Sequence, residues 1–184
     1  QTYIQRNGDQ YEYLTDEEKD VEQEIKNTEV ESSDVADELE KIVFDFVIKQ
    51  RKIRYDAGSS QNQGQDYSYS RKLDDRLHGR EYELSINVIS PFHEHTDNEQ
   101  MLRTASTYKA DELFVLMPSD ERLVRDLLMF KRTEKYIKQN ISVTQQEAVK
   151  RILNDKGFQN REREARLRQQ VHTLLAGDTT CTVP

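Results

Sequence analysis

Residues 82–117 restrict the possible folds more than any other part of the sequence. Apolar residues first alternate with polar ones, at Tyr82, Leu84, Ile86 and Val88, which predicts a strand ending at Pro91. A helical spacing of apolar residues follows, and residues 113–117 form a short apolar run typical of a strand buried on both faces. Strand, helix and strand in this order predict one right-handed βαβ unit with parallel strands.

Helix starts are marked along the chain by three capping sequences of the type Thr-x-x-Glu, at Thr15–Glu18, Thr96–Glu99 and Thr144–Glu147. Ser119 is a fourth expected cap, and a further helix should begin near Ser33. The last helix is expected to continue past Gly157 and to stop at Gly177.

A hairpin is predicted at the N-terminus, because Asn7-Gly8 stands between two short aromatic runs and both residues accept a positive φ. We therefore expect an α/β fold of the mixed α+β type. It comprises a small mixed sheet containing one βαβ unit, an N-terminal wing-like hairpin and a long C-terminal helical hairpin. The expected domains are a wing hairpin ending a winged-helix domain (1–14), helices plus the mixed-sheet domain (15–118) and a long-helix extension (119–184).

Composition narrows the functional classes. The 184 residues are 34% hydrophobic and 34% charged, with a net charge of −8, which excludes a nucleic-acid binder that uses its whole surface but leaves a local patch open. One cysteine, Cys181, cannot form an internal disulfide and fits a reducing compartment. Without an apolar run of membrane-spanning length or a signal peptide, the sequence predicts a cytoplasmic protein. The ends, Gln1 and Pro184, lead us to expect a segment of a larger protein.

Nucleotide-binding motifs of the P-loop type do not occur in this sequence. Gly58 and Gly64 are separated by five residues, and Gln65 stands where the motif requires lysine. Asp120 and Glu121 follow an apolar run like a magnesium-binding pair, but Pro118 and Ser119 intervene and move the carboxylates into the first turn of a helix. No catalytic residue is assigned, and whether the segment has enzymatic activity stays open.

Histidines offer the best candidate for a metal site. His93 and His95 alternate in an extended stretch, so their imidazoles could point toward one ion. Two ligands do not complete a site, and polar residues in a strand-to-helix turn are the preferred interpretation. His78 and His172 are expected to face solvent.

A local nucleic-acid surface is the second candidate site. Aromatic and basic residues alternate at Tyr67, Tyr69, Arg71, Lys72 and Arg76, a pattern that can stack on bases and hold phosphates. Aspartates lie among these residues, and tyrosine is also a common strand residue, so an ordinary strand is the alternative.

A partner-binding stripe is the third candidate. The last helix carries Leu167, Val171 and Leu174 at helical spacing on an otherwise charged surface, which is typical of helices that bind a partner or self-associate. The alternative is that these residues belong to the core.

Three segments carry a resemblance to a known family. They are residues 9–25 (DQYEYLTDEEKDVEQEI), 113–120 (LFVLMPSD) and 131–140 (KRTEKYIKQN). Together they resemble the BREX phage-defence P-loop ATPase family, called BrxC or PglY, in a region downstream of the nucleotide-binding core. The similarity extends over nearly the whole chain, although related defence ATPases share the first phrase.

This resemblance implies a parent protein that binds ATP and magnesium and restricts phage together with other defence subunits. None of the family's nucleotide-binding residues has a counterpart here. The implied role is a scaffold segment that couples the motor to partner subunits or to self-association, with no membrane contact. The alternative is a nucleic-acid-binding module of another bacterial defence or repair ATPase, so DNA is a possible partner.

Overall fold

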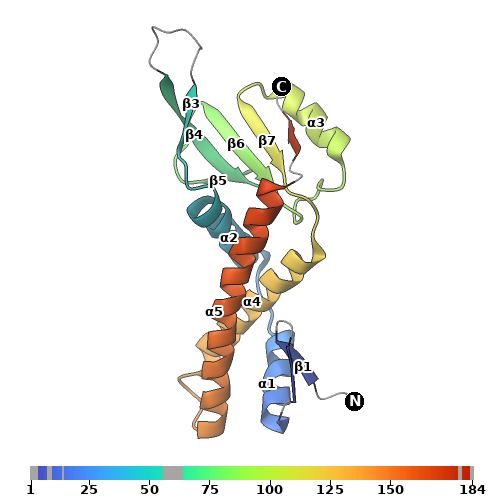
Figure 1. Cartoon of the computed structure of the whole chain (residues 1–184), viewed down its shortest axis with the longest axis vertical. Helices are drawn as coiled ribbons and strands as arrows, with labels where there is room; N and C mark the ends of the chain where they lie inside the picture. The colour runs from blue at the N-terminus through green and yellow to red at the C-terminus, as the bar shows by residue number, and fades with distance from the viewer. Residues whose placement is uncertain (1–3, 8–9, 14, 56–63, 178–179, 183–184) are drawn as a thin grey trace. The chain divides into compact units, whose positions relative to one another are not determined.

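The computed structural model describes residues 4–7, 10–13, 15–55, 64–177 and 180–182, and the side chains from residue 15 to residue 177 within these ranges. The chain divides into two compact units (Figure 1). Unit 1 comprises Gln1–Asp37 and Arg125–Leu167, and unit 2 comprises Glu38–Val124 and Arg168–Pro184. Each unit is described separately below.

Unit 1 begins with the predicted hairpin. Strands β1 (Ile4–Asn7) and β2 (Gln10–Tyr13) pair antiparallel, with Ile4 opposite Tyr13 and Asn7 opposite Gln10. The hairpin is therefore confirmed, whereas Gly8 lies outside the described residues. Its assignment as the wing of a winged-helix domain stays a prediction.

Helix α1 (Asp16–Asn27) starts at the predicted capping box. The Thr15 hydroxyl accepts a hydrogen bond from the Glu18 amide at 3.3 Å, and the Glu18 carboxylate accepts one from the Thr15 amide at 2.7 Å. Val21 and Ile25 are both buried. These two residues face the unit's core, as the helical spacing of the sequence requires.

Two long helices supply the rest of unit 1, although each also contributes residues to unit 2. They are α4 (Glu121–Asn140) and α5 (Glu147–Ala176), and they confirm the predicted C-terminal helical hairpin. The core of unit 1 forms where apolar residues of α1, α4 and α5 meet, at Val21, Ile25, Tyr136, Ile152 and Leu153. A tertiary hydrogen bond from the Asn160 side chain to the Phe130 carbonyl, 3.0 Å long, joins α5 to α4.

The starts of these two helices differ from the prediction. Asp120, not Ser119, caps α4, because its Oδ1 accepts from the amides of Arg122 and Leu123 at 2.8 and 3.1 Å. At α5, the Glu147 carboxylate pairs with Lys150 at 3.0 Å within the first turn, and Thr144 belongs to the turn that ends α4. Both predicted caps placed the helix start too early.

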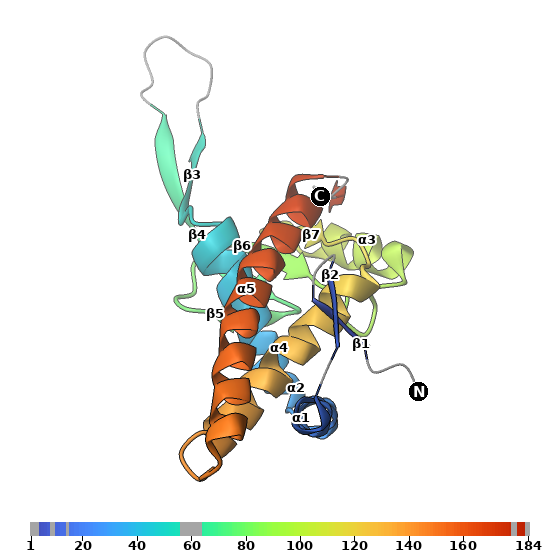
Figure 2. The ribbon, with the colours of Figure 1, turned by 60° about the horizontal axis from the view of Figure 1, so that its bottom comes forward.

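Unit 2 contains a six-stranded mixed sheet (Figures 1 and 2). Its strands are β3 (Lys52–Tyr55), β4 (Gln65–Leu73), β5 (Arg76–His78), β6 (Leu84–Ile89), β7 (Glu112–Leu116) and β8 (Thr180–Thr182). The order is β3-β4-β6-β7-β8, with β5 paired to β4. The β4–β6 and β6–β7 pairs are parallel, and the other pairs are antiparallel. The predicted mixed sheet is confirmed, with β5 and β8 as strands that the sequence did not indicate.

The predicted βαβ unit is present as β6, α3 (Glu99–Tyr108) and β7. Ile89, Leu102 and Phe114 pack together, so α3 covers the β6–β7 side of one face of the sheet. Asn98, not Thr96, caps α3, because the Asn98 side chain accepts from the Met101 amide at 3.0 Å. The Thr96 amide is already bonded to the His93 carbonyl in the preceding turn.

A π-helical segment of unit 2 lies next to the other face of the sheet. α2 (Ser32–Lys41) continues as a π-helical segment, η1 (Ile42–Val47), where a bond from the Ile48 amide to the Val43 carbonyl spans five residues. The wider turn buries three consecutive residues, Ile42, Val43 and Phe44. The Arg71 guanidinium of β4 lies 5.7 Å from the centre of the Phe44 ring, which places this face of β4 against η1.

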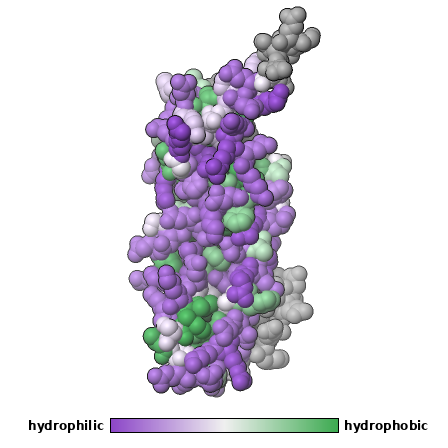
Figure 3. Space-filling model, turned by 90° about the vertical axis from the view of Figure 1, so that its left-hand side faces the viewer, coloured by the Kyte–Doolittle hydropathy of each residue, from purple (hydrophilic) through white to green (hydrophobic). Residues whose placement is uncertain are grey.

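Within the described ranges, no helix combines the length and apolarity that crossing a membrane requires. The face drawn in Figure 3 is mostly hydrophilic and has small separate hydrophobic areas.

Candidate functional site

A two-residue turn between β4 and β5 begins the most polar region of unit 2. Leu73 pairs with Arg76, and the two intervening aspartates, Asp74 and Asp75, both have positive φ values of 48° and 68°. Two residues in this conformation form the tight hairpin turn that usually takes Asn-Gly or Asp-Gly. Each costs roughly 1–2 kcal/mol relative to an ordinary backbone conformation, so the surroundings must stabilise the turn.

Asp74 connects this turn to the end of β6. Its Oδ1 accepts from the Ser90 amide at 2.7 Å, and its Oδ2 accepts from the Ser90 hydroxyl at 2.6 Å. The Asp74 amide donates to the Val88 carbonyl at 2.9 Å. Charge-assisted hydrogen bonds of this kind contribute about 1.5–3 kcal/mol each, which is enough to offset the backbone cost at Asp74.

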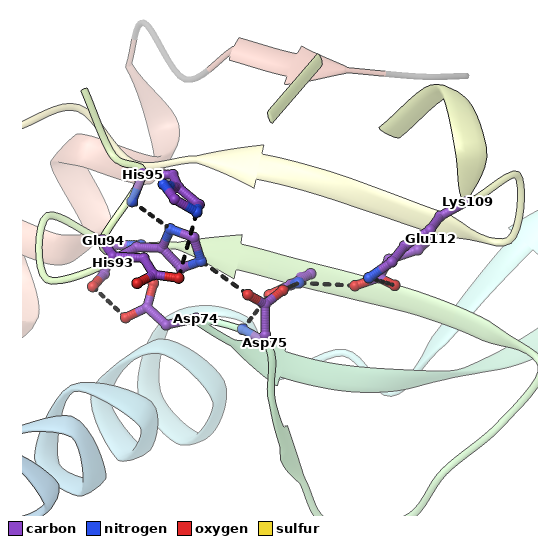
Figure 4. Close-up of polar contacts among 9 residues, drawn as sticks. Asp74, Asp75, His93, Glu94, His95, Lys109 and Glu112 are labelled. Atoms are coloured by element: carbon purple, nitrogen blue, oxygen red, sulfur yellow. Dashed lines mark hydrogen bonds and ion pairs between the residues drawn. The ribbon is translucent and has the colours of Figure 1, made fainter. Parts of the chain in front are cut away.

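Asp75 connects the same turn to two further groups (Figure 4). Its Oδ1 accepts from the Asn87 amide group at 2.8 Å, and its Oδ2 lies 2.9 Å from His93 Nε2. The Asp75 backbone amide donates to Asn87 Oδ1 at 3.2 Å. Asn87 is fully buried although it lies in the middle of β6. The turn and the strand therefore satisfy each other's polar groups.

Glu112 continues the network across the sheet. Asn87 donates its second amide proton to Glu112 Oε1 at 2.8 Å. Glu112 Oε2 lies 3.4 Å from Lys72 Nζ and 3.3 Å from Lys109 Nζ. The Glu112 side chain is 5% exposed, so two ammonium groups and an amide replace the water that it loses. These contacting residues are called the polar network below, and its members are Lys72, Asp74, Asp75, Asn87, Ser90, His93, Lys109 and Glu112.

The two neighbouring aspartates have opposite pKa shifts. Burial raises the pKa of Asp74, and hydrogen bonds from Ser90 reduce this rise without cancelling it. Burial also acts to raise the pKa of Asp75, but hydrogen bonds from His93 and Asn87, with the charge of Lys109, outweigh it and lower the pKa. Asp75 is thus the more stable carboxylate of the pair.

His93 has no ring nitrogen left for chemistry. Nε2 donates to Asp75, and Nδ1 accepts from the His95 amide at 3.1 Å. A general base needs a free nitrogen within reach of a substrate proton, and a metal ligand needs one lone pair. The arrangement instead fixes the segment after β6 against the β4–β5 turn, so the polar network has a structural role.

The two candidate metal ligands, His93 and His95, lie close together but contact different carboxylates. The rings of His93 and His95 are 5.6 Å apart and inclined by 62°. His95 Nε2 lies 3.4 Å from the Glu94 carboxylate. Among the residues that the structure describes, no group of three or more His, Cys, Asp or Glu side chains could hold a metal ion.

Sequence reasoning missed the residues of the polar network other than His93 and Lys72. Asp74, Asp75, Ser90 and His93 lie at the carboxyl ends of the parallel strands β4 and β6, the edge where α/β sheets commonly place functional groups, whereas Glu112 lies at the amino end of β7. The available signal was the pair Asp74-Asp75 directly after the alternating strand β4, because aspartate is common in tight turns. Nothing local distinguishes Asn87, which alternates with apolar residues like any solvent-facing strand residue.

The five residues proposed for nucleic-acid contact do not form one surface. Tyr69 is buried and its hydroxyl donates to the Gln50 carbonyl, whereas Arg71 lies over Phe44. Lys72 points to the opposite face and contacts Glu112, and Arg76 lies 3.6 Å from Glu40. Tyr67 is 40% exposed, so its ring remains accessible, as stacking on a base requires.

The proposed partner stripe on α5 is mostly interior, which corrects the expectation of an exposed surface. Leu167 and Val171 are fully buried, and Leu174 is half-buried. The helical spacing was correct, but it equally describes a core-facing stripe. His78 likewise is not solvent-facing in the way expected, because it contacts Glu40 and stacks on Phe44 at 5.6 Å between ring centres. His172 is exposed.

Comparison with known families identifies the chain. A family model described as "BREX ATP-binding protein BrxC 4th domain with six-stranded beta sheet" matches residues 28–180. The sheet of unit 2 has six strands, in agreement with that description. No solved structure matches the chain. The match covers most of the 184 residues and includes β3 to β7, α2, α3, α4 and α5, and it ends at the first residue of β8. The chain therefore belongs to the family of the fourth domain of the BREX ATP-binding protein BrxC.

Proposed function

We propose that this domain is a non-catalytic interaction module, which couples a BREX phage-defence ATPase to partner subunits by accepting an apolar side chain between α4 and α5. The observation that carries the proposal is a pocket of about 270 Å³ in unit 1. Phe130, Ile137 and Gly157 supply its apolar wall, and Glu134, Lys138, Asn160, Arg161 and Glu164 supply polar groups. An apolar hollow bordered by charges of both signs suits a protein partner.

Gly157 is the unusual residue of this pocket. It lies inside the 30-residue helix α5, where glycine costs about 1 kcal/mol relative to alanine. A Cβ added at Gly157 would meet its nearest neighbour, Ile137 Cδ1, at 3.8 Å, which is an ordinary contact. The packing of the two helices therefore does not require glycine. A residue that breaks a local rule without a structural gain is a candidate for function.

The surface beside the pocket has the composition of a binding hot spot. Phe158 is 56% exposed, and the Arg161 guanidinium lies 5.7 Å from the centre of its ring. Aromatic residues and arginine carry much of the binding energy in protein interfaces. In our proposal, a partner side chain enters the hollow at Gly157 and Phe158 covers its flank.

ATP and magnesium belong to other parts of the parent protein in this proposal. The residues of this chain do not fit them, because Asp120, the best-placed acidic residue, uses its carboxylate to cap α4. Action together with other defence subunits is also part of the proposal, and the family description supports it by naming a BREX protein. A cytoplasmic location is part of the proposal too.

The experiment compares two substitutions at one position in the full-length protein. Gly157→Leu fills the pocket, whereas Gly157→Ala adds one methyl group and should raise the melting temperature through better helix propensity. Binding to each purified subunit of the same defence system is measured by biolayer interferometry, and self-association by sedimentation velocity. We expect Gly157→Leu to weaken one of these interactions at least tenfold and Gly157→Ala to change it little.

Phe158→Ala provides a second test that leaves the core untouched, since the side chain is mostly exposed. It should weaken the same interaction as Gly157→Leu while the circular dichroism spectrum stays unchanged. If neither variant affects partner binding or self-association, the pocket is not a docking site and the proposal is wrong.

A further inference from the structure

The β3–β4 ribbon differs from the rest of unit 2 in its exposure. Ile53 pairs with Tyr67 and Lys52 with Ser68 across the two antiparallel strands. All four residues of β3 are exposed, as are the first three of β4. Figures 1 and 2 show the ribbon extending beyond the remaining strands of the sheet. Both faces of this two-stranded element are therefore open over these residues.

The ribbon, taken together with residues 49–51 that lead into it, is basic although the chain is acidic. Residues 49–67 contain four basic side chains, Lys49, Arg51, Lys52 and Arg54, and two acidic ones, in a chain whose net charge is −8. All four basic residues are exposed. A local concentration of positive charge on an acidic protein is the electrostatic signature of a site for polyanions.

The two faces of the ribbon carry different chemistry. Because successive side chains of a strand point to opposite faces, Lys52 and Arg54 share one face, and Ile53 and Tyr55 share the other. Tyr67 lies directly opposite Ile53 and joins the second face. Ile53, Tyr55 and Tyr67 are 43%, 63% and 40% exposed, which is high for large apolar side chains. On the first face, Ser68 lies opposite Lys52 and Asp66 lies opposite Arg54, so this face carries two cations and one carboxylate, whereas the second face carries large apolar and aromatic groups.

We propose that the β3–β4 ribbon inserts into the major groove of duplex DNA. The major groove admits a two-stranded ribbon, and an element with both faces open can contact both walls of a groove. Lys52 on the ribbon, with Lys49 and Arg51 in the exposed segment that leads into β3, neutralises phosphates, while Tyr55 and Tyr67 make apolar contacts with the sugars and the thymine methyl groups. The site is separate from the Gly157 pocket, which lies in unit 1.

The strength of binding should follow from the number of phosphate contacts. Each contact contributes a slope of about −0.9 in the logarithm of affinity against the logarithm of salt concentration. Three contacts therefore predict a roughly 40-fold loss of affinity when monovalent salt rises fourfold. The affinity itself should lie in the micromolar range typical of contacts that do not depend on base sequence.

The test uses the 184-residue chain, a fluorescent duplex, the same sequence as a single strand, and vesicles with anionic phosphatidylserine. Fluorescence anisotropy is recorded at two salt concentrations that differ fourfold. The test variant carries Lys49→Glu, Arg51→Glu and Lys52→Glu, and it should bind the duplex at least tenfold more weakly, with a shallower salt slope. The matched control carries Arg122→Glu, Arg125→Glu and Arg151→Glu, three exposed basic residues outside the ribbon, and it should bind like the wild type.

Each outcome decides the proposal. Wild-type binding that requires the three ribbon residues and prefers the duplex supports it. No saturable binding, equal weakening by the control variant, a preference for the single strand, or equal binding to vesicles overturns it. Charged residues on an edge strand also prevent edge-to-edge association, and glutamate preserves this protection. Sedimentation velocity should therefore find both triple variants in the same oligomeric state as the wild type.

Discussion

Asn87 and Asp75 hydrogen-bond to each other in both directions. The Asn87 side-chain amide donates to Asp75 Oδ1 at 2.8 Å, and the Asp75 backbone amide donates to Asn87 Oδ1 at 3.2 Å. A fully buried strand residue thus holds a turn whose backbone conformation is unfavourable for aspartate. Because the neighbouring Asp74 also has a positive φ but has different hydrogen-bond partners, the two aspartates form a matched pair for mutation.

The first prediction compares Asp75→Asn with Asp74→Asn. Asparagine tolerates the turn conformation, so only side-chain bonds change. In Asp75→Asn, the new side chain has only one oxygen, so its NH2 group must face one of the two donors, Asn87 or His93, and that hydrogen bond is lost. Because the Asp75 side chain is 56% exposed, we expect a loss of about 1 kcal/mol in unfolding free energy.

Asp74→Asn should remain within about 0.5 kcal/mol of the wild type. Its oxygen still accepts from the Ser90 amide, and the Ser90 hydroxyl can rotate to accept from the new amide group. Urea unfolding at neutral pH, followed by circular dichroism, measures both variants. An equal loss in the two would show that turn strain, not bonding, controls this site.

The second prediction concerns the pH dependence of the same variants. The lowered pKa of Asp75 means that its stabilisation is present above the unfolded-state pKa of about 3.9 and is lost as the pH falls through the folded value. The deficit of Asp75→Asn relative to the wild type should therefore shrink as the pH is lowered from about 6 to about 3.

Asp74 should behave in the opposite way, because its pKa is raised. Its contribution is present below the unfolded-state pKa and is lost as the pH rises through the folded value. Asp74→Asn should thus gain stability relative to the wild type as the pH increases over the same range. Urea unfolding at several pH values checks both trends, and slopes of the same sign would contradict the assignment.

The third prediction concerns unit 1. The Tyr136 hydroxyl donates to the Glu24 carboxylate, and burial together with this acidic partner raises the Tyr136 pKa far above the ordinary value for tyrosine. Tyr136→Phe should lower the unfolding free energy by about 1 kcal/mol. In the absorbance titration of the nine tyrosines, it should remove one that ionises late. Loss of an early-titrating tyrosine instead would show that the hydroxyl is open to water.

The fourth prediction tests the buried stripe of α5. Because Leu167 has no exposed surface, Leu167→Ala should cost about 2–5 kcal/mol, and Leu167→Asp should cost more. His172→Asp, at an exposed position of the same helix, serves as the control and should change stability little. Thermal melting followed by circular dichroism measures all three. An unchanged melting temperature for Leu167→Asp would restore the interpretation of the stripe as a partner surface.

The sequence alone was sufficient for the elements whose signals are local. Thr15 and Glu18 are three residues apart, so the capping box could be recognised without knowledge of any other part of the chain. The same is true of the alternation before Pro91 and of the helical spacing in α4 and α5. Backbone geometry sets these periods, and each can be read within a window of one element.

Cap positions show the limit of this reasoning. Thr96 and Ser119 have the right chemistry, but Asn98 and Asp120 occupy the cap positions in the folded chain. A turn that bonds the Thr96 amide to the His93 carbonyl decides the first case. Competition between neighbouring residues that can all cap a helix is settled by where the preceding strand ends, which depends on the sheet.

Which polar residues are buried was decided only by the tertiary structure. Asn87, Asp75 and Glu112 are separated by 12 and 25 residues, and each looks like a surface residue by its own segment. Leu167 and Val171 were recognised as a stripe, but whether a stripe faces the core or a partner depends on what the rest of the chain places beside it. Period and propensity act within one element, whereas burial and hydrogen-bond partners depend on contacts between distant segments. Local sequence signals therefore fixed the long helices, the N-terminal hairpin and the βαβ order, whereas packing decided the short strands β5 and β8 and which polar and apolar residues remain available for function.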